Sequence, residues 1–123
     1  MTRQVYYAMT MVFDPDQAEG VTRSEYLQAL AAEGFNAGEP YDPVYRNPLL
    51  NLSDRTSPIP YRADVPQDYA TLRLPGCEQA KNETAVLMSH TRLLAERAYI
   101  DQLLDAVAKV NGHIELERPQ LIM

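Results

Sequence analysis

The chain has 123 residues, of which 46% are hydrophobic and 23% charged, and this length and composition are typical of a single globular domain. Its net charge of −6 argues against nucleic acid or an anionic membrane as a partner, because phosphate binding needs clustered lysines and arginines. No stretch approaches the roughly 20 apolar residues of a membrane span, and the single cysteine excludes an internal disulfide, so we expect a cytoplasmic protein.

The first expected element is a strand from Gln4 to Phe13. Its side chains alternate between two faces, and both faces are fairly apolar. This pattern predicts a strand that is central in its sheet or covered on both sides. Asp14 to Asp16 contains a proline and favours a turn after the strand.

A helix is expected from Arg23 to Glu33. Thr22 and Glu25 fit a capping box, in which each residue's side chain binds the other's backbone N–H group. Gly34 follows the last turn, at a position where a left-handed residue closes a helix. The residues from Phe35 to Ala37 then predict a second, short strand.

The segment from Tyr41 to Arg73 differs in character from the rest of the chain. Its five prolines argue against long helices and central strands, and four tyrosines and four arginines are interleaved with them. A solvated surface loop is the ordinary interpretation. However, structureless loops longer than about 12–15 residues are uncommon in compact domains. We therefore expect this loop to pack on a surface that lies outside the chain.

The segment from Leu74 to Leu94 is the most informative. Leu74 and Pro75 predict the start of a helical turn, because proline suits the first helical position. Ala85 to Met88 is a short apolar run, which predicts a buried strand ending at His90. A polar side chain at the end of a buried strand can face a ligand, although an ordinary αβ unit would also place a histidine there.

The last expected element is a helix from Ile100 to Val110, with apolar residues at i, i+3, i+4, i+7 and i+10. Leu104 lies in the middle of this stripe, so we expect it to be buried. Asn111 and Gly112 predict the end of the helix. The resulting order of elements predicts an α+β fold, a small two-layer domain with a sheet of about three strands and helices on one face.

The residues alone define no catalytic or metal centre. Cys77 has no histidine motif near it and is expected to be a small buried hydrophobic residue. His90 and His113 are too few, and too far from a cysteine or carboxylate pattern, to predict a metal site. Glycine-rich phosphate loops are absent from the sequence. Composition and spacing therefore predict only an α+β domain with a polar and aromatic surface.

Four groups of short motifs add to this interpretation. In chain order they are V-Y-Y with F-D-P between residues 5 and 15, G-V-T-R-S-E with A-A-E-G between 20 and 34, Y-D-P-V-Y with N-P-L between 41 and 49, and L-P with Glu78, Ala80, Glu83 and His90. Together they resemble the C-terminal small domain of the DegT/StrS family of PLP-dependent sugar and cyclitol aminotransferases, over nearly the whole chain. P-I-P-Y at 58–61 and H-T-R-L-L at 90–94 are similar to the scyllo-inosose aminotransferase branch.

The resemblance implies that residues 1–123 are a single small domain, with the long loop at 41–73, and that the large PLP-binding domain is missing. The intact enzyme would use pyridoxal phosphate and an amino donor to aminate a keto-sugar or keto-cyclitol. Neither Lys81 nor Lys109 lies in the family's Schiff-base motif, so we expect this chain to bind no cofactor covalently and to be inactive alone. The family's proline two residues before the histidine is replaced by Met88.

The residues that the resemblance places near the substrate are Tyr41, Tyr45, Arg46 and His90. Tyrosine and histidine can hydrogen-bond the hydroxyl groups of a sugar or cyclitol, and arginine can bind the carboxylate of the amino donor. Packing of the loop is an equally good explanation for each of them. A different class of function also fits, namely a stand-alone interaction module that pairs with a separately encoded partner domain.

Overall fold

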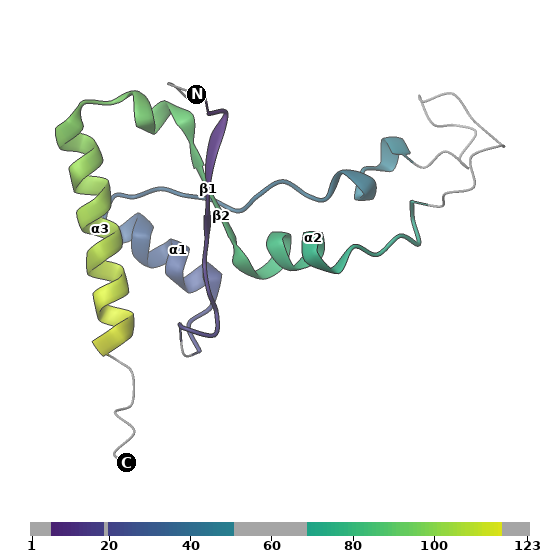
Figure 1. The fold of residues 1–123 in the computed structure, drawn as a ribbon, viewed down its shortest axis with the longest axis horizontal. Helices are drawn as coiled ribbons and strands as arrows, with labels where there is room; N and C mark the ends of the chain where they lie inside the picture. The colour runs from purple at the N-terminus through teal and green to yellow at the C-terminus, as the bar shows by residue number, and fades with distance from the viewer. Residues whose placement is uncertain (1–5, 19, 51–68, 117–123) are drawn as a thin grey trace, which may run out of the picture. The chain divides into compact units, whose positions relative to one another are not determined.

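The computed structural model describes residues 6–18, 20–50 and 69–116 (Figure 1). The chain divides into two compact units. Unit 1 consists of Met1–Pro40 and Glu83–Met123, and unit 2 is Tyr41–Asn82. Among the helices described, none combines the length and the apolar character needed to cross a bilayer.

The sheet of unit 1 consists of two antiparallel strands, β1 (Ala8–Val12) and β2 (Ala85–Ser89). The apolar run predicted from Ala85 is therefore a strand, as expected. Because side chains alternate along a strand, two cross-strand pairs of apolar residues share the face that is turned toward the core. These pairs are Met9 with Met88 and Met11 with Val86.

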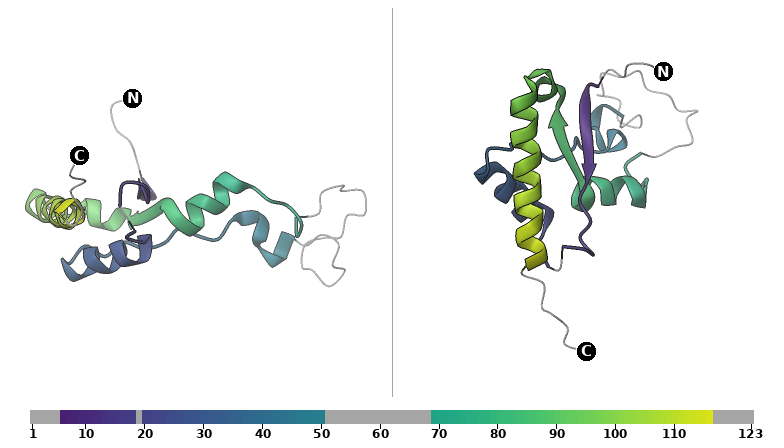
Figure 2. Two further views of the ribbon diagram at one scale, coloured as in Figure 1. Left: turned by 90° about the horizontal axis from the view of Figure 1, so that it is seen from below. Right: turned by 60° about the vertical axis from the view of Figure 1, so that its left-hand side comes forward.

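Two helices pack against this sheet, α1 (Arg23–Ala32) and α3 (Arg97–Leu116) (Figure 2). One cluster of buried side chains joins both helices to β2, and residues of β1 pack against it. The small α+β architecture is thus confirmed. The buried residues of this cluster are Leu30, Phe35, Met88, Leu103, Ala106 and Val110.

The expected third strand is not present among the described residues. In its place Gly38 forms an isolated bridge to Leu87, with both hydrogen bonds made, at 2.9 and 2.8 Å. The next hydrogen-bonding position toward the C-terminus is Pro40, which has no N–H group to donate. On the other side, the backbone N–H group of Phe35 bonds Leu30 at the end of α1. Pro40 therefore ends the ladder toward the C-terminus, and on the other side the chain is still bonded to the end of α1 at Phe35.

The prediction that β1 is central or covered on both sides is wrong for the residues described. The strand is shorter than expected, and Gln4 and Val5 lie outside the described residues. Thr10 is exposed and Val12 is 78% exposed. Only the face with Met9 and Met11 is covered, because both helices pack on that side.

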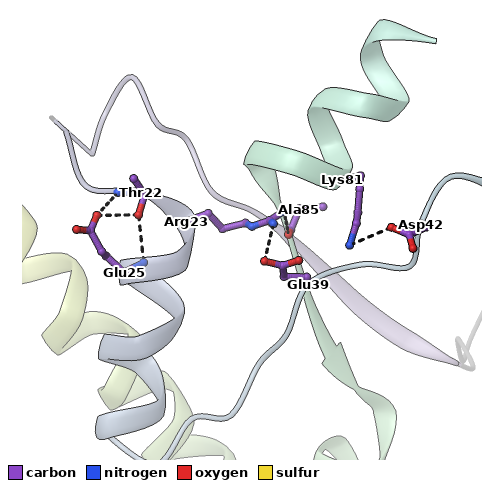
Figure 3. A network of polar contacts seen from close by, with 7 residues as sticks. All are labelled: Thr22, Arg23, Glu25, Glu39, Asp42, Lys81 and Ala85. Atoms are coloured by element: carbon purple, nitrogen blue, oxygen red, sulfur yellow. Dashed lines mark hydrogen bonds and ion pairs between the residues drawn. The ribbon is translucent and has the colours of Figure 1, made fainter. Parts of the chain in front are cut away.

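Helix α1 begins as the sequence predicts. The Thr22 Oγ1 atom accepts a hydrogen bond from the Glu25 backbone at 3.3 Å, and the Glu25 carboxylate accepts one from the Thr22 backbone at 2.7 Å (Figure 3). The helix ends at Ala32, and Gly34 adopts a φ of +85°, a conformation that favours glycine. Both ends of α1 are therefore set by local sequence.

Helix α3 extends past its predicted end. It passes through Asn111 and Gly112 and continues to Leu116. Glycine in a helix costs about 1 kcal/mol relative to alanine. Here Val110 is buried, and Tyr26 donates a hydrogen bond to Asn111 at 3.0 Å. Ile114 packs against the cluster described above and against a second buried cluster, which consists of Phe13, Ala18 and Val86. These tertiary contacts offset the glycine and keep the helix intact.

The buried stripe of α3 also differs from the prediction. Leu103, Ala106 and Val110 are each 6% exposed, whereas Leu104 is 61% exposed. Successive residues are turned by about 100° around a helix, so the neighbour of a buried residue can lie at the edge of the contact. The expectation that Leu104 is a core residue was therefore wrong.

Unit 2 contains short helical segments. The described ones are two 3₁₀ turns, Val44–Arg46 and Pro48–Leu50, and the helix α2 (Pro75–Gln79), which continues into a π-helical segment, Ala80–Thr84. Helix α2 begins at Pro75, as predicted. Cys77 is exposed, so the expectation of a buried thiol was wrong. The central part of the predicted loop, 51–68, lies outside the described residues.

Candidate functional site

Two of the four predicted site residues meet in unit 2, at a carboxylate that the prediction did not include. The hydroxyl of Tyr45 donates a hydrogen bond to Glu78 Oε1 at 2.6 Å, and Nη2 of Arg46 donates to the same oxygen at 2.5 Å. The Arg46 guanidinium also lies 5.2 Å from the centre of the Tyr45 ring, within the range of a cation–π contact. We call these three residues the Glu78 cluster.

Local structure brings the cluster together. Pro43 precedes the 3₁₀ turn that carries Tyr45 and Arg46, and the backbone N–H group of Arg46 bonds the carbonyl of Pro43 at 2.8 Å. Glu78 lies in the first turn of α2, and its own N–H group bonds the carbonyl of Leu74 at 3.0 Å. The turn and the helix are therefore each fixed by backbone bonds that involve a cluster residue.

A second ion pair joins the same two segments of unit 2. Lys81 Nζ lies 3.5 Å from Asp42 Oδ1 (Figure 3). Asp42 is 84% exposed, so this pair contributes little to stability by itself. The pair does, however, add a second contact between the segment that carries Tyr45 and the segment that carries Glu78.

The electrostatics of the Glu78 cluster favour a charged carboxylate and a neutral tyrosine. Hydrogen bonds from Tyr45, and then from Arg46, hold the pKa of Glu78 below its ordinary value of 4.5. Burial, followed by the hydrogen bond to Glu78, raises the pKa of Tyr45 above 10.0. The pKa of Arg46 is raised chiefly by its bond to Glu78. At neutral pH the cluster therefore holds one anion, one cation and one neutral hydroxyl.

Exposure separates the two predicted residues of the cluster. Tyr45 is 8% exposed, and its hydroxyl hydrogen is donated to Glu78. The side chain of Arg46 is 38% exposed, and only its Nη2 atom bonds Glu78. Arginine has five N–H donors, and among the described residues the only side-chain hydrogen bond of Arg46 is the one from Nη2 to Glu78, so Nε and Nη1 can donate to an anion. Arg46 is accordingly the member of the cluster that can receive a ligand.

Tyr41 also belongs to unit 2 and lies in the segment that enters the 3₁₀ turn. It is 70% exposed. A tyrosine with most of its surface in solvent can offer both its ring and its hydroxyl to a sugar-like molecule.

His90, the fourth predicted residue, belongs to unit 1. It follows β2 directly and opens the 3₁₀ turn His90–Leu94, as the sequence predicted for a polar residue at the strand's end. Its Nδ1 atom lies 2.6 Å from the carbonyl oxygen of Tyr7, and the two rings stack with centroids 6.2 Å apart. A carbonyl can only accept, so Nδ1 carries the proton and Nε2 of the neutral ring is an acceptor.

The residues that the structure describes form no metal site. Within 6–18, 20–50 and 69–116, no three histidine, cysteine, aspartate or glutamate side chains converge as a metal centre would require. Unit 1 does contain a surface hollow of about 470 Å³ between α1 and α3, with the ion pair of Lys109 and Glu33 among its lining residues. None of the four predicted site residues lines it.

Sequence reasoning missed Glu78 as a site residue. It lies 32 positions from Arg46, and no periodic pattern connects a glutamate in a short helix to an arginine in a proline-rich loop. One signal was available, since Glu78 is part of the L-P motif group that supports the family resemblance.

Fold and site together define a small α+β chain with a tyrosine–arginine–carboxylate cluster in one of its two units. No family model matches the sequence. Several curated relatives match it in sequence, and three of them share one provisional name, L-glutamine:3-amino-2,3-dideoxy-scyllo-inosose aminotransferase. The predicted resemblance is confirmed, because the chain is related in sequence to these scyllo-inosose aminotransferases.

The matches cover nearly all of this chain but a minor part of each relative. The protein from Streptoalloteichus tenebrarius is 35% identical over 124 aligned positions, which include 96% of this chain and 29% of the relative. The proteins from Micromonospora echinospora and Streptomyces kanamyceticus are 29% and 30% identical, over 93% of this chain and 28% of each relative. The chain thus spans less than a third of the length of the relatives it matches.

Proposed function

We propose that this chain is the C-terminal small domain of a PLP-dependent aminotransferase of the DegT/StrS type, which transfers an amino group from an amino donor to a keto-sugar or keto-cyclitol. The observation that supports this most strongly is the alignment of 96% of the chain with a single relative that is provisionally named an L-glutamine:3-amino-2,3-dideoxy-scyllo-inosose aminotransferase. The remaining length of the relative, about 71%, would supply the large PLP-binding domain and most of the catalytic machinery.

The chain's own lysines do not fit the cofactor. A Schiff-base lysine must be able to lose its proton, which burial or a neighbouring cation favours and an anion opposes. Lys81 is paired with Asp42 at 3.5 Å, and Lys109 is paired with Glu33 at 2.7 Å. Both amines are therefore engaged in ion pairs with carboxylates. The proposed partner domain would therefore hold the cofactor, and this chain would be inactive alone.

The chain's proposed contribution is to substrate binding. Arg46 would bind the carboxylate of the amino donor through the donors that Glu78 leaves available. His90 would accept a hydrogen bond from a substrate hydroxyl at Nε2, and Tyr41, which is 70% exposed, would contact the same molecule. Tyr45 would act through Arg46, since its ring lies beneath the guanidinium.

A segment exchange tests the proposal. In the Streptoalloteichus tenebrarius relative, the matched segment is replaced by this chain, and glutamine-dependent amination of a keto-cyclitol is measured. We expect the exchanged enzyme to be active, and the relative with its own segment reinserted serves as the control. An inactive exchange enzyme that is folded and binds pyridoxal phosphate would contradict the proposal.

The isolated chain provides the complementary test. After incubation with pyridoxal phosphate and removal of the excess, we expect no absorbance band at about 410–430 nm, the region of an internal aldimine. Such a band, lost in Lys81→Met or Lys109→Met, would show that the chain holds the cofactor itself.

A second candidate function is a stand-alone interaction module that pairs with a separately encoded partner domain. The observation that favours it is the exposure of large side chains on β1 and just before it. Val12 of β1 is 78% exposed, and Tyr7, which precedes the strand, is 73% exposed. The remainder of the relative, expressed without the matched segment, provides the test. A complex between the two separate chains on gel filtration supports the module, and activity in the fused form alone supports the single enzyme.

A further inference from the structure

We infer that Glu78 is a positioning residue that holds Arg46 ready for the carboxylate of an amino donor. This inference rests on the proposed function. It also extends that function, since it assigns a role to a residue 32 positions away from the arginine that it orients.

The geometry is that of a shared acceptor. A single oxygen, Glu78 Oε1, receives hydrogen bonds from both Tyr45 and Arg46, at 2.6 and 2.5 Å. Hydrogen bonds between ionised partners are stronger and more directional than neutral ones. The guanidinium is therefore fixed on one side by the carboxylate and rests on the Tyr45 ring, 5.2 Å from its centre.

This arrangement reduces the cost of binding a second carboxylate. An unrestrained arginine loses rotational freedom when it binds, which weakens the complex. Arg46 has already been ordered by Glu78 and still has 38% of its side chain exposed. The negative charge of Glu78 is the opposing effect, because it repels an incoming anion. The two protein donors and the Arg46 charge partly offset that repulsion.

The role that we infer for Tyr45 differs from the hydrogen bond to substrate that the sequence predicted. Its hydroxyl hydrogen is engaged by Glu78 and the side chain is 8% exposed, so it supports the arginine and does not donate to a ligand. Glu78 thus orders both Tyr45 and Arg46, and of the three residues only the arginine would contact the substrate.

Titration of Tyr45 in the isolated chain tests the positioning, without any aminotransferase activity. The ring is followed by NMR with ¹³C-labelled tyrosine, and the signal is assigned by its absence in Tyr45→Phe. In the wild type we expect the pKa of Tyr45 to lie above 10.0, and in Glu78→Gln to fall toward that value, because the carboxylate's charge is removed. Glu78→Asp should fall between the two, and Glu83→Gln, at an exposed glutamate of the next helical segment, should change nothing.

A second measurement needs no variant at Glu78, and so remains valid if Glu78→Gln fails to fold. Between pH 6 and 3, the Tyr45 ring signal should shift as Glu78 takes up its proton, with a midpoint below 4.5. The inference that Glu78 positions Arg46 would be overturned by either of two results. One is a Tyr45 signal that does not shift when Glu78 is protonated, and the other is an unchanged pKa of Tyr45 in folded Glu78→Gln.

The functional part is measured in the exchanged enzyme. Glu78→Gln should raise KM for L-glutamine by about tenfold, on the order of one charge-assisted hydrogen bond, while kcat is retained. An unchanged KM, despite a shifted Tyr45 titration, would reduce Glu78 to a structural role and overturn the inference. A wholly inactive exchange enzyme would count against the proposed function, and the titration would still decide whether Glu78 orders the cluster.

Discussion

Leu103 and Leu104 are neighbours on α3 with opposite environments, since Leu103 is 6% exposed in the core and Leu104 is 61% exposed. The pair provides a built-in control for the packing of unit 1. We predict that Leu103→Ala lowers the free energy of unfolding by about 2–5 kcal/mol, the range for buried large-to-small changes. Leu104→Ala should change it by less than about 0.5 kcal/mol.

Chemical denaturation of the two variants, with equal m-values, checks this prediction. Equal losses of stability in both would show that α3 is rotated relative to the sheet, and that Leu104 belongs to the core after all.

The contrast shows which parts of the fold can be predicted from sequence. Thr22 with Glu25, Gly34 and Pro75 act through neighbours in the chain, so their patterns predicted the ends of α1 and the start of α2. The third strand and the end of α3 depended on tertiary contacts. Pro40 prevents the ladder from continuing beyond Gly38. In α3, the buried Val110 before Gly112 and the packed Ile114 after it keep the helix intact through the glycine. The spacing of apolar residues in the sequence does not reveal either of these tertiary effects.

The candidate site divides in the same way. Tyr45 and Arg46 are adjacent in sequence, and a local motif was enough to select them. Glu78 reaches them only through the fold of unit 2, so its role required the structure.

The N-terminus of α1 predicts a specific pH dependence. The backbone bond, and then the side-chain bond, from Thr22 keep the pKa of Glu25 below its ordinary 4.5. A lowered pKa in the folded state stabilises the fold when the carboxylate is charged. This stabilisation is complete above about pH 4.5 and is lost as the pH falls through the folded-state value.

Amide hydrogen exchange in the first turn of α1, measured at pH 7 and below pH 4, reads this effect. We expect faster exchange in the wild type at low pH, after correction for the intrinsic rate, and a Glu25→Gln variant that loses this dependence. Ser24→Ala, an exposed change in the same turn, should behave as the wild type does. In Thr22→Ala we expect a loss of about 1 kcal/mol. If exchange in this turn still depended on pH in Glu25→Gln, a group other than Glu25 would be responsible for the effect.

His90 should adopt one tautomer. Its Nδ1 atom lies 2.6 Å from the Tyr7 carbonyl, which requires a proton on Nδ1 and leaves Nε2 as an acceptor. Long-range ¹H–¹⁵N NMR spectra, recorded at a pH where the ring is neutral, distinguish the two nitrogens. The exposed His113 of α3 is an internal reference. An Nε2–H form of His90 would remove the proposed acceptor for a substrate hydroxyl.

The most direct test of the central claim is the dependence of the amination rate on L-glutamine in the exchanged enzyme that carries Arg46→Ala. If Arg46 binds the donor carboxylate, KM for L-glutamine should rise on the order of 10- to 100-fold, while KM for the keto-cyclitol stays the same. Arg97→Ala is the matched control, because Arg97 is 88% exposed and pairs only with Asp101 on its own helix among the described residues. A KM for L-glutamine that is unchanged by Arg46→Ala, or raised equally by Arg97→Ala, would contradict the account.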